Sequence, residues 1–215
     1  MIAEAVLEIG ISNATMKSVA AHIGMSVPGL YHHVRNRRDL LLLAGDYSMS
    51  KMRLPNDRGQ HWSEWLREWA RYTRGAFLDE PQVFWQFMSG ALKPEQMVDV
   101  IDNVQTILSR QGFSPSAAIA AWSTVSQCAL GSVVTTLRER TTSEAGHATN
   151  EEFSRLLAER PSDELTGLRS LVGEGDTTSD DLFEDELTTV LVGIAARRGE
   201  EWGEVVARGK GTSSG

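Results

Sequence analysis

The sequence predicts an all-α protein, with an N-terminal helix-turn-helix domain of three helices followed by a larger C-terminal helical domain. Apolar residues recur at spacings of three and four along almost the whole chain, and the alternation typical of strands is absent. Only 6 of the 215 residues are proline. With 41% hydrophobic residues, the chain can bury the core of one large or two small domains.

The N-terminal part of the chain predicts four helices, at residues 2–9, 15–23, 27–34 and 37–52. The first two end at Gly10 and Gly24, because glycine readily adopts the backbone conformation that closes a helix. The fourth ends before Pro55, since proline cannot continue a helix. Residues 1–54 form the first predicted domain, which holds the three helices of the helix-turn-helix and the fourth helix that follows them.

Residues 55–207 predict a second domain of mostly longer helices. Their approximate ranges are 62–78, 81–89, 94–111, 116–140, 151–158, 162–172 and 180–197. Residues 141–150 and 173–179 are rich in Gly, Thr and Ser, so we expect mobile loops there. We expect residues 208–215 to form a disordered tail.

Charge is divided unevenly along the chain. Residues 1–54 hold 6 of the 21 Lys and Arg residues but only 4 of the 29 Asp and Glu residues. A basic-leaning end on an acidic protein suits contact with a polyanion, although ordinary variation on a solvated surface would look the same.

Nothing in the sequence predicts a membrane partner or export. No apolar run approaches the ~20 residues of a membrane span, and the first residues lack the regions of a signal peptide, so we expect a cytoplasmic protein. The single cysteine, Cys128, lies in an apolar stretch. We therefore expect its thiol to be buried as a small apolar group and not to act as a nucleophile or metal ligand. We expect no cofactor.

Residues 14–34 fit a helix-turn-helix. Two short helices flank Gly24, Ala20 lets them cross closely, and Ser26 can cap the second. The second helix exposes apolar groups that can touch a thymine methyl, and Tyr and His donors that can reach bases or phosphates. Helix N-termini near Thr15 and Arg37 can present backbone N–H groups to the phosphates beside the groove.

A resemblance to the DNA-binding domain of the TetR family of bacterial transcriptional regulators covers residues 1–54. Residues 15–41 carry it, above all the run Gly29-Leu30-Tyr31-His32-His33-Val34-Arg35-Asn36-Arg37-Arg38-Asp39-Leu40-Leu41. The resemblance implies a homodimer that places its second helices in successive major grooves of a palindromic operator on double-stranded DNA. It also implies a C-terminal domain that binds a small effector. The implied DNA contacts are Thr15, Lys17, Val27, Pro28, Gly29, Tyr31, His32, His33 and Arg37.

Three features depart from the family pattern. Members of the family have a glycine after the first helix. Aligning Gly10 with that glycine places Met1 about one turn inside the helix, so we expect the first helix to be truncated. Gly29 has no side chain where the family often has a Thr or Ser hydroxyl, and the second helix is poor in Arg and Lys. Either base discrimination is lower than in the family, or it depends on backbone contacts and DNA shape.

Aromatic residues are dense near the start of the second domain, where four of the six tryptophans lie between residues 62 and 88. Helical spacing places Trp62, Trp65 and Trp69 on one face, which a packed core explains as well as an effector pocket does. The predicted lining of such a pocket is Trp62, Trp65, Trp69, Phe84, Trp85, Met88, Met97, Ile101, Trp122 and Gln127.

Two helices of the second domain predict partner surfaces. Small residues fill 116–140, and an apolar stripe runs along 180–197. One chain could bury these surfaces internally, but the family resemblance favours a homodimer. The predicted interface is Ala121, Val125, Phe183, Leu187, Val190, Leu191 and Ile194.

We expect neither an enzyme nor a metal site. The chain lacks a Gly-rich phosphate loop, a nucleophile elbow and metal-ligand spacing, and His32 and His33 are adjacent on a helix, so they point apart. The sequence predicts a ligand-responsive DNA-binding regulator, a repressor released by a small, largely apolar or aromatic effector. The alternative is a helical scaffold protein of the same fold that has lost specific operator binding.

Overall fold

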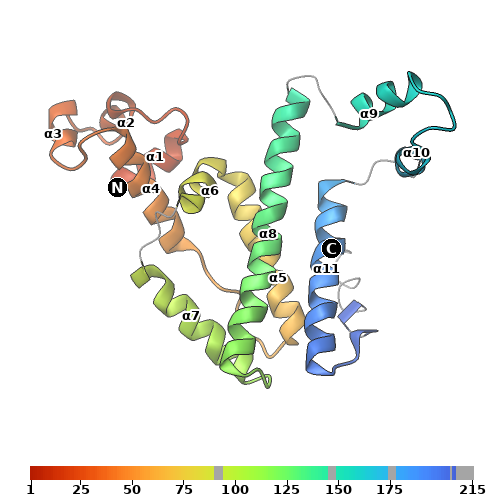
Figure 1. The fold of residues 1–215 in the computed structure, drawn as a ribbon. Coiled ribbons are helices and arrows are strands. Elements are labelled where there is room, and N and C mark those ends of the chain that lie inside the picture. Colours follow the sequence, from red (N-terminus) through yellow and green to blue (C-terminus); the bar gives the residue numbers. More distant parts are fainter. Residues whose placement is uncertain (90–93, 145–148, 174–177, 204, 207–215) are drawn as a thin grey trace. The chain divides into compact units, whose positions relative to one another are not determined.

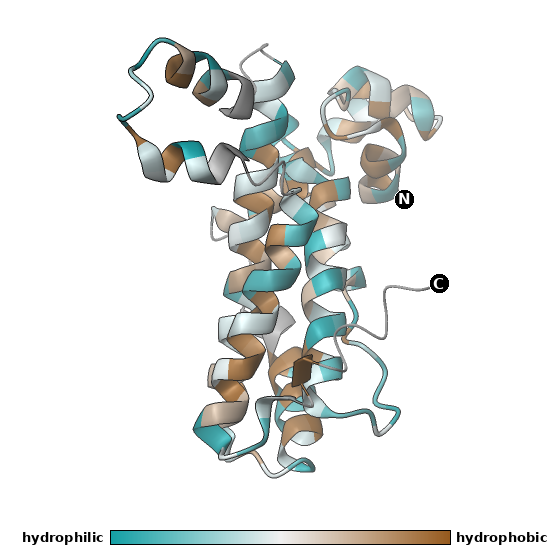
Figure 2. Ribbon diagram, turned by 90° about the vertical axis from the view of Figure 1, so that its right-hand side faces the viewer, coloured by the Kyte–Doolittle hydropathy of each residue, from teal (hydrophilic) through white to brown (hydrophobic). Residues whose placement is uncertain are grey.

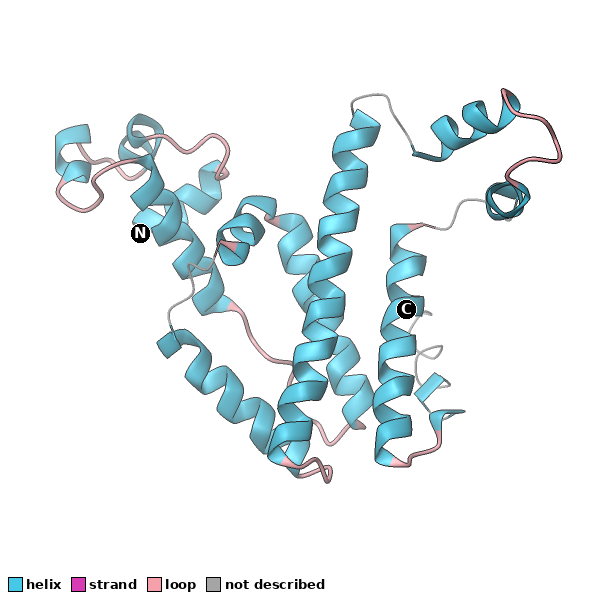
Figure 3. Cartoon of the chain, in the orientation of Figure 1, coloured by secondary structure: helices cyan, strands magenta, loops and turns pink. Residues whose placement is uncertain are grey.

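The computed structural model describes residues 1–89, 94–144, 149–173, 178–203 and 205–206, and these ranges contain helices and no strand (Figure 3). The predicted all-α class is confirmed. In chain order the helices are α1 (Ile2–Ile9), α2 (Met16–His22), α3 (Val27–Tyr31), α4 (Arg37–Lys51), α5 (Trp62–Asp79), α6 (Pro81–Met88), α7 (Pro94–Ser109), α8 (Pro115–Glu144), α9 (Thr149–Ala158), α10 (Thr166–Gly173) and α11 (Ser179–Arg198), as labelled in Figure 1.

The chain forms two compact units. The first comprises residues 1–56 and 79–115, and the second comprises 57–78 and 116–215. The predicted domain boundary at residue 54 therefore does not coincide with the units, because α6 packs against α4 and so joins the N-terminal helices. The division into domains stays a prediction.

The helix-turn-helix of the first unit is built by side-chain caps and one glycine. Thr15 accepts a hydrogen bond from the Ser18 N–H at 3.0 Å, and Ser26 accepts one from the Gly29 N–H at 3.1 Å. Each cap satisfies a backbone donor that the first helical turn leaves free. Gly24 has φ +69°, in the left-handed region, so the turn between α2 and α3 requires glycine.

Small and branched apolar side chains hold α1 to α4 together. α1 packs against both α2 and α4, and α2 packs against α3. Val6, Val19, Leu30 and Leu40 are fully buried in this core, and Ala20 is buried at the crossing as predicted. The core leaves the opposite surface of α3 exposed.

Helices α4 and α6 approach closely at Gly45. A Cβ atom at this position would lie 2.0 Å from Gln86 Oε1 and 3.2 Å from Gln86 Cδ. Only glycine therefore leaves room for the Gln86 amide where it lies, and this amide oxygen is itself buried without a hydrogen-bond partner. The contact ties α6 to the helix that follows the helix-turn-helix.

In the second unit, α5, α8 and α11 lie side by side (Figures 1 and 2). Hydrophobic residues (brown) and hydrophilic residues (teal) both occur along the long helices in Figure 2. The core residues include Trp65, Leu66, Phe77, Ala118, Ala129, Val133 and Ala195. By length and composition alone, α8 is apolar enough to cross a membrane. In the second unit its Ser126 and Ser132 hydroxyls accept hydrogen bonds from Trp69 and Arg74 of α5.

Three helix ends differ from the predicted ones by three residues or more. α8 continues to Glu144, because the hydroxyls of Thr141 and Thr142 donate to the carbonyls one turn earlier and so remain compatible with a helix. α3 ends at Tyr31 instead of residue 34, and α10 begins at Thr166 instead of residue 162. The predicted tail at 208–215 lies outside the described residues.

Candidate DNA-contacting surface and effector site

The outward side of α3 gathers most of the predicted DNA-contacting residues. Leu30 is fully buried and faces the core. Pro28, His32 and His33 are exposed, and the Tyr31 side chain is 51% exposed. Two further predicted contacts, Val27 and Gly29, are half-buried. An exposed run on a helix held in place by one buried leucine is suited to entering a DNA groove.

The start of α2 presents a second exposed group beside this helix. Thr15 and Lys17 are both exposed. The Thr15 hydroxyl accepts from the Ser18 N–H and lies 3.0 Å from Ser18 Oγ, so its capping role already occupies it. Lys17 is the exposed cation of this helix and is free of that constraint.

The DNA contact of Arg37 stays a prediction, because its guanidinium already has partners within the chain. Its Nε donates to the Ala14 carbonyl at 2.8 Å, and its Nη2 donates to the carbonyls of Ile11 and Ser12 at 3.2 and 3.3 Å. Because the planar guanidinium donates to three carbonyls of the α1–α2 connection, its first role is to fasten α4 to that connection. A phosphate contact would have to compete with these bonds.

The tryptophans of α5 belong largely to the core of the second unit. Trp62, Trp65 and Trp69 are 1%, 0% and 6% exposed. Trp62 Nε1 donates to Glu200 Oε2 at 2.7 Å, and Trp69 Nε1 donates to Ser126 Oγ at 2.8 Å. Their burial and these partners within the chain support the packed-core interpretation, above all for Trp62 and Trp65, whose side chains are almost completely buried.

The surroundings of Trp69 nevertheless contain two polar atoms without partners. The rings of Trp69 and Trp122 lie with their centroids 6.0 Å apart. Trp122 Nε1 and Thr73 Oγ1, in the part of the chain that the structure describes, are buried and form no hydrogen bond. Buried polar groups are normally satisfied, so these two atoms point to a missing partner such as a water or a ligand.

The remaining predicted pocket residues lie in different surroundings. In the first unit Phe84 is buried, Trp85 and Met88 are each 51% exposed, and Ile101 is 40% exposed. Met97 lies outside the residues whose side chains are described. In the second unit Gln127 is exposed on the outer side of α8, so it does not face Trp69.

The predicted dimer interface also stays a prediction, because a single chain already buries most of its residues. Five of its seven residues are buried inside a single chain: Ala121, Val125, Phe183, Leu187 and Leu191. Val190 and Ile194 are half-buried. The apolar stripe of α11 faces the core of its own unit, which leaves a different side of α8 and α11 exposed.

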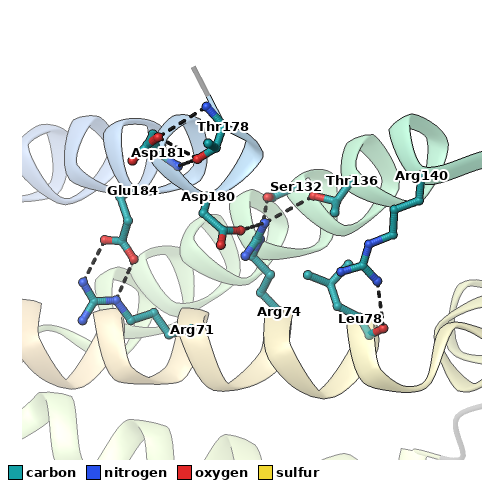
Figure 4. Close-up of polar contacts among 10 residues, drawn as sticks. All are labelled: Arg71, Arg74, Leu78, Ser132, Thr136, Arg140, Thr178, Asp180, Asp181 and Glu184. Carbon is teal, nitrogen blue, oxygen red and sulfur yellow. Dashed lines mark hydrogen bonds and ion pairs between the residues drawn. The ribbon is translucent and has the colours of Figure 1, made fainter. Parts of the chain in front are cut away.

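Three arginines of α5, Arg67, Arg71 and Arg74, reach across the second unit, an arrangement that sequence analysis missed. Figure 4 shows the contacts of Arg71 and Arg74. Arg71 Nε lies 2.6 Å from Glu184 Oε1, and Arg67 Nη1 lies 3.2 Å from Glu184 Oε2. Arg74 donates to Ser132 on α8 and pairs with Asp180 on α11. The four-residue spacings 67–71 and 180–184 place like charges on one helix face, a signal that could have predicted the pairing.

Burial shapes the electrostatics of this cluster. Burial raises the pKa of Glu184, but its hydrogen bond with Arg71 and the charges of Arg71 and Arg67 outweigh that effect, and the pKa is lowered. Burial lowers the pKa of Arg67, and the negative charge of Glu184 opposes this shift.

Burial also raises the pKa of the Cys128 thiol, which makes it a poor nucleophile. No three His, Cys, Asp or Glu side chains gather as a metal site within the described ranges.

Comparisons with known proteins give one consistent result. Residues 3–44 match the family described as "Bacterial regulatory proteins, tetR family", and residues 54–198 match "Tetracyclin repressor-like, C-terminal domain". The chain is 28% identical over 201 residues to the Escherichia coli tetracycline repressor protein class A from transposon 1721, covering 89% of this chain and 85% of that protein.

Solved structures share the fold. Apo ActR from Streptomyces coelicolor has a TM-score of 0.71 at 22% identity, with 92% of this chain and 94% of that chain covered. ActR in complex with actinorhodin has a TM-score of 0.69 at 23% identity, with 93% and 96% covered. At this level of identity the likeness shows the fold alone.

Proposed function

Because the chain belongs to the TetR family of bacterial transcriptional regulators, we propose that it is a homodimeric repressor that binds a palindromic operator through α3 and is released by a small effector. The exposed outward surface of α3 carries this proposal, since Leu30 and the Ser26 cap hold the helix while Pro28, Tyr31 and His32 stay exposed. The family match favours this function over a scaffold that has lost operator binding.

The effector is a largely apolar, aromatic molecule with at least one hydrogen-bond acceptor. Trp69 and Trp122 provide ring faces for stacking, and Trp122 Nε1 is a buried donor without a partner. Thr73 Oγ1 is a second buried polar atom that a ligand could satisfy. A relative of this chain is a tetracycline repressor, and a structure of the same fold holds actinorhodin, so the fold accommodates small molecules.

The dimer forms through the exposed sides of α8 and α11. Ala120, Thr124 and Gly131 are exposed on α8, and Thr189 and Gly193 are exposed on α11. A Cβ atom at either glycine would meet no other atom within 4 Å. These small side chains allow the helices of a second copy to approach closely, which large side chains would prevent.

Within the first unit, the packing of α6 on α4 offers a route by which the response to the effector would reach the DNA-contacting helix. The Gln86 amide occupies the space beside Gly45, so a shift of α6 displaces α4 and the helices packed on it. A hundredfold change in operator affinity corresponds to a coupling free energy of about 2.7 kcal/mol. A typical hydrogen bond contributes about 1 kcal/mol, so two or three hydrogen bonds that form in only one of the two states would supply this amount.

Selection of genomic DNA fragments by the purified full-length protein tests the proposal. The selection is run at about 0.15 M salt, because phosphate contacts alone would retain any fragment at low salt. We expect enrichment of a palindrome with half-sites about 34–36 Å, or one helical turn, apart. Equal recovery of all fragments would contradict operator binding.

A matched pair of variants tests the effector site on the enriched fragment. Multi-ring aromatic compounds are screened for release of this DNA, and the active compound is titrated against Trp122→Phe and Trp69→Phe. Trp122→Phe is expected to weaken release, yet to lower stability less than Trp69→Phe, which loses a hydrogen bond worth about 1 kcal/mol. Unchanged release of DNA by the compound in Trp122→Phe would show that Trp122 Nε1 does not bind the effector.

A further inference from the structure

Gly29 has no side chain, and the side chain of Met25 lies against it at the edge of the exposed side of α3. A Cβ atom at Gly29 would lie 3.2 Å from Met25 Cγ, 3.6 Å from Met25 Sδ and 3.1 Å from Ser26 Oγ. The two shorter distances are tighter than ordinary van der Waals contact. The Met25 side chain therefore occupies the space where a larger side chain at position 29 would begin.

The geometry of α3 places this contact at the edge of the surface that faces away from the core. At 100° per residue, Pro28 and the C-cap His32 lie opposite the buried Leu30, and the half-buried Gly29 lies at the edge of that side, about 100° from Leu30. The Met25 side chain lies against Gly29 at this edge and is half-buried. It thus borders the outward surface of α3, although the residue itself precedes the helix.

The backbone holds Met25 there without help from its side chain. The Met25 N–H donates to the Ala20 carbonyl at 2.8 Å, directly after Gly24 reverses the chain. The Ser26 hydroxyl then caps α3. Shortening the Met25 side chain would leave this turn and its hydrogen bonds in place.

We propose that Met25 determines base specificity in place of the side chain that Gly29 lacks, by packing its thioether against the C5 methyl group of a thymine in each half-site. This inference rests on the proposed function, because it requires α3 in the major groove. The thymine methyl is the apolar group at the major-groove edge of the bases. A flexible, polarizable thioether can lie flat over a glycine and cover that methyl.

The experiment removes the methyl group and the thioether separately. Each symmetric pair of thymines in the enriched operator is replaced by uracil, which lacks only the C5 methyl group, and affinity is measured for the wild-type protein and for Met25→Ala. Burial of one methyl group corresponds to about fourfold in affinity per half-site and about fifteenfold for both. We expect the wild type to lose this factor at one thymine position, and Met25→Ala to lose nothing there.

Two further variants sharpen the test. Gly29→Ala introduces the Cβ atom that Met25 excludes, so it is expected to displace the thioether and reduce the same uracil effect. Met49→Ala makes the same change on α4 and is expected to keep every uracil effect of the wild type. If the wild type binds its palindrome but Met25→Ala keeps the full uracil effect at every position, the inference is wrong and the proposed function stands. If the wild type binds no sequence preferentially, both are wrong.

Discussion

The arginine cluster of the second unit makes a quantitative prediction for the variant Glu184→Gln. Glu184 on α11 accepts hydrogen bonds from Arg71 at 2.6 and 2.9 Å and from Arg67 at 3.2 Å. The Arg67 side chain is only 5% exposed, whereas that of Glu184 is 37% exposed. The change removes the negative charge and keeps the shape and one acceptor oxygen.

The expected cost is about 2 kcal/mol in the free energy of unfolding. Arg71 and Glu184 are each about one-third exposed, so their pair contributes at most about 1 kcal/mol. Arg67 is buried, and a hydrogen bond to a charged partner is worth about 1.5–3 kcal/mol, of which glutamine keeps a part. Breaking a fully buried pair would cost about 3–5 kcal/mol, which is an upper bound here.

Denaturant unfolding followed by circular dichroism, at one fixed protein concentration, measures this cost. The pKa of Glu184 is lowered in the folded protein, so its stabilising effect is complete above the ordinary value of 4.5 and is lost as pH falls through the lower folded value. The difference between wild type and Glu184→Gln should therefore be full at neutral pH and shrink in acid.

Asp180→Asn is the matched control, because it breaks the other arginine–carboxylate pair between α5 and α11. The Asp180 side chain is 79% exposed, and Arg74 keeps hydrogen bonds to Ser132 and Thr136. Its expected cost is below about 1 kcal/mol. Equal costs for the two variants, or a Glu184→Gln effect that persists unchanged in acid, would refute the reasoning.

Three further variants test the first unit. Arg37→Lys keeps the charge but loses the guanidinium that donates hydrogen bonds to three carbonyls. It should therefore lower the free energy of unfolding by about 1–3 kcal/mol, measured by denaturant unfolding. Unchanged stability would favour a phosphate contact as the role of Arg37. Gly45→Ala should displace the Gln86 side chain and so alter the release of DNA by the effector. Its effect on stability should be smaller, because alanine favours the helix by about 1 kcal/mol and offsets the cost of the displacement. Unaltered release would argue against a route from α6 to α4. Tyr31→Ala should weaken binding to every sequence alike in quantitative binding assays, whereas His32→Ala should change the selected sequence; the reverse pattern would contradict the assignment of α3.

Local signals in the sequence were sufficient to predict most of the fold. Ser26 caps α3, and Gly24 has the positive φ that a helix-turn-helix requires. These features depend on neighbouring residues, so their chemistry is visible in the sequence. Where threonine allowed either helix or loop, as at Thr141 and Thr142, the composition predicted a loop and the structure has a helix.

Partners distant in the sequence could not be predicted in the same way. The spacing of Phe183 and Leu187 shows that they are buried, but burial within one chain and burial against a second copy produce the same periodicity. Arg67 and Glu184 are separated by 117 residues, and Arg37 bonds carbonyls that carry no side-chain signature. These contacts depend on how helices pack, which local patterns do not specify.

The spacing of the two half-sites tests the central claim most directly. The full-length protein is titrated, at about 0.15 M salt, against its enriched palindrome and against the same palindrome with about five base pairs inserted between the half-sites. Half a turn places the second half-site on the opposite face of the DNA, beyond reach of a dimer with two α3 helices. The account predicts that specific binding falls to the level of a scrambled duplex, and undiminished affinity for the lengthened palindrome would contradict it.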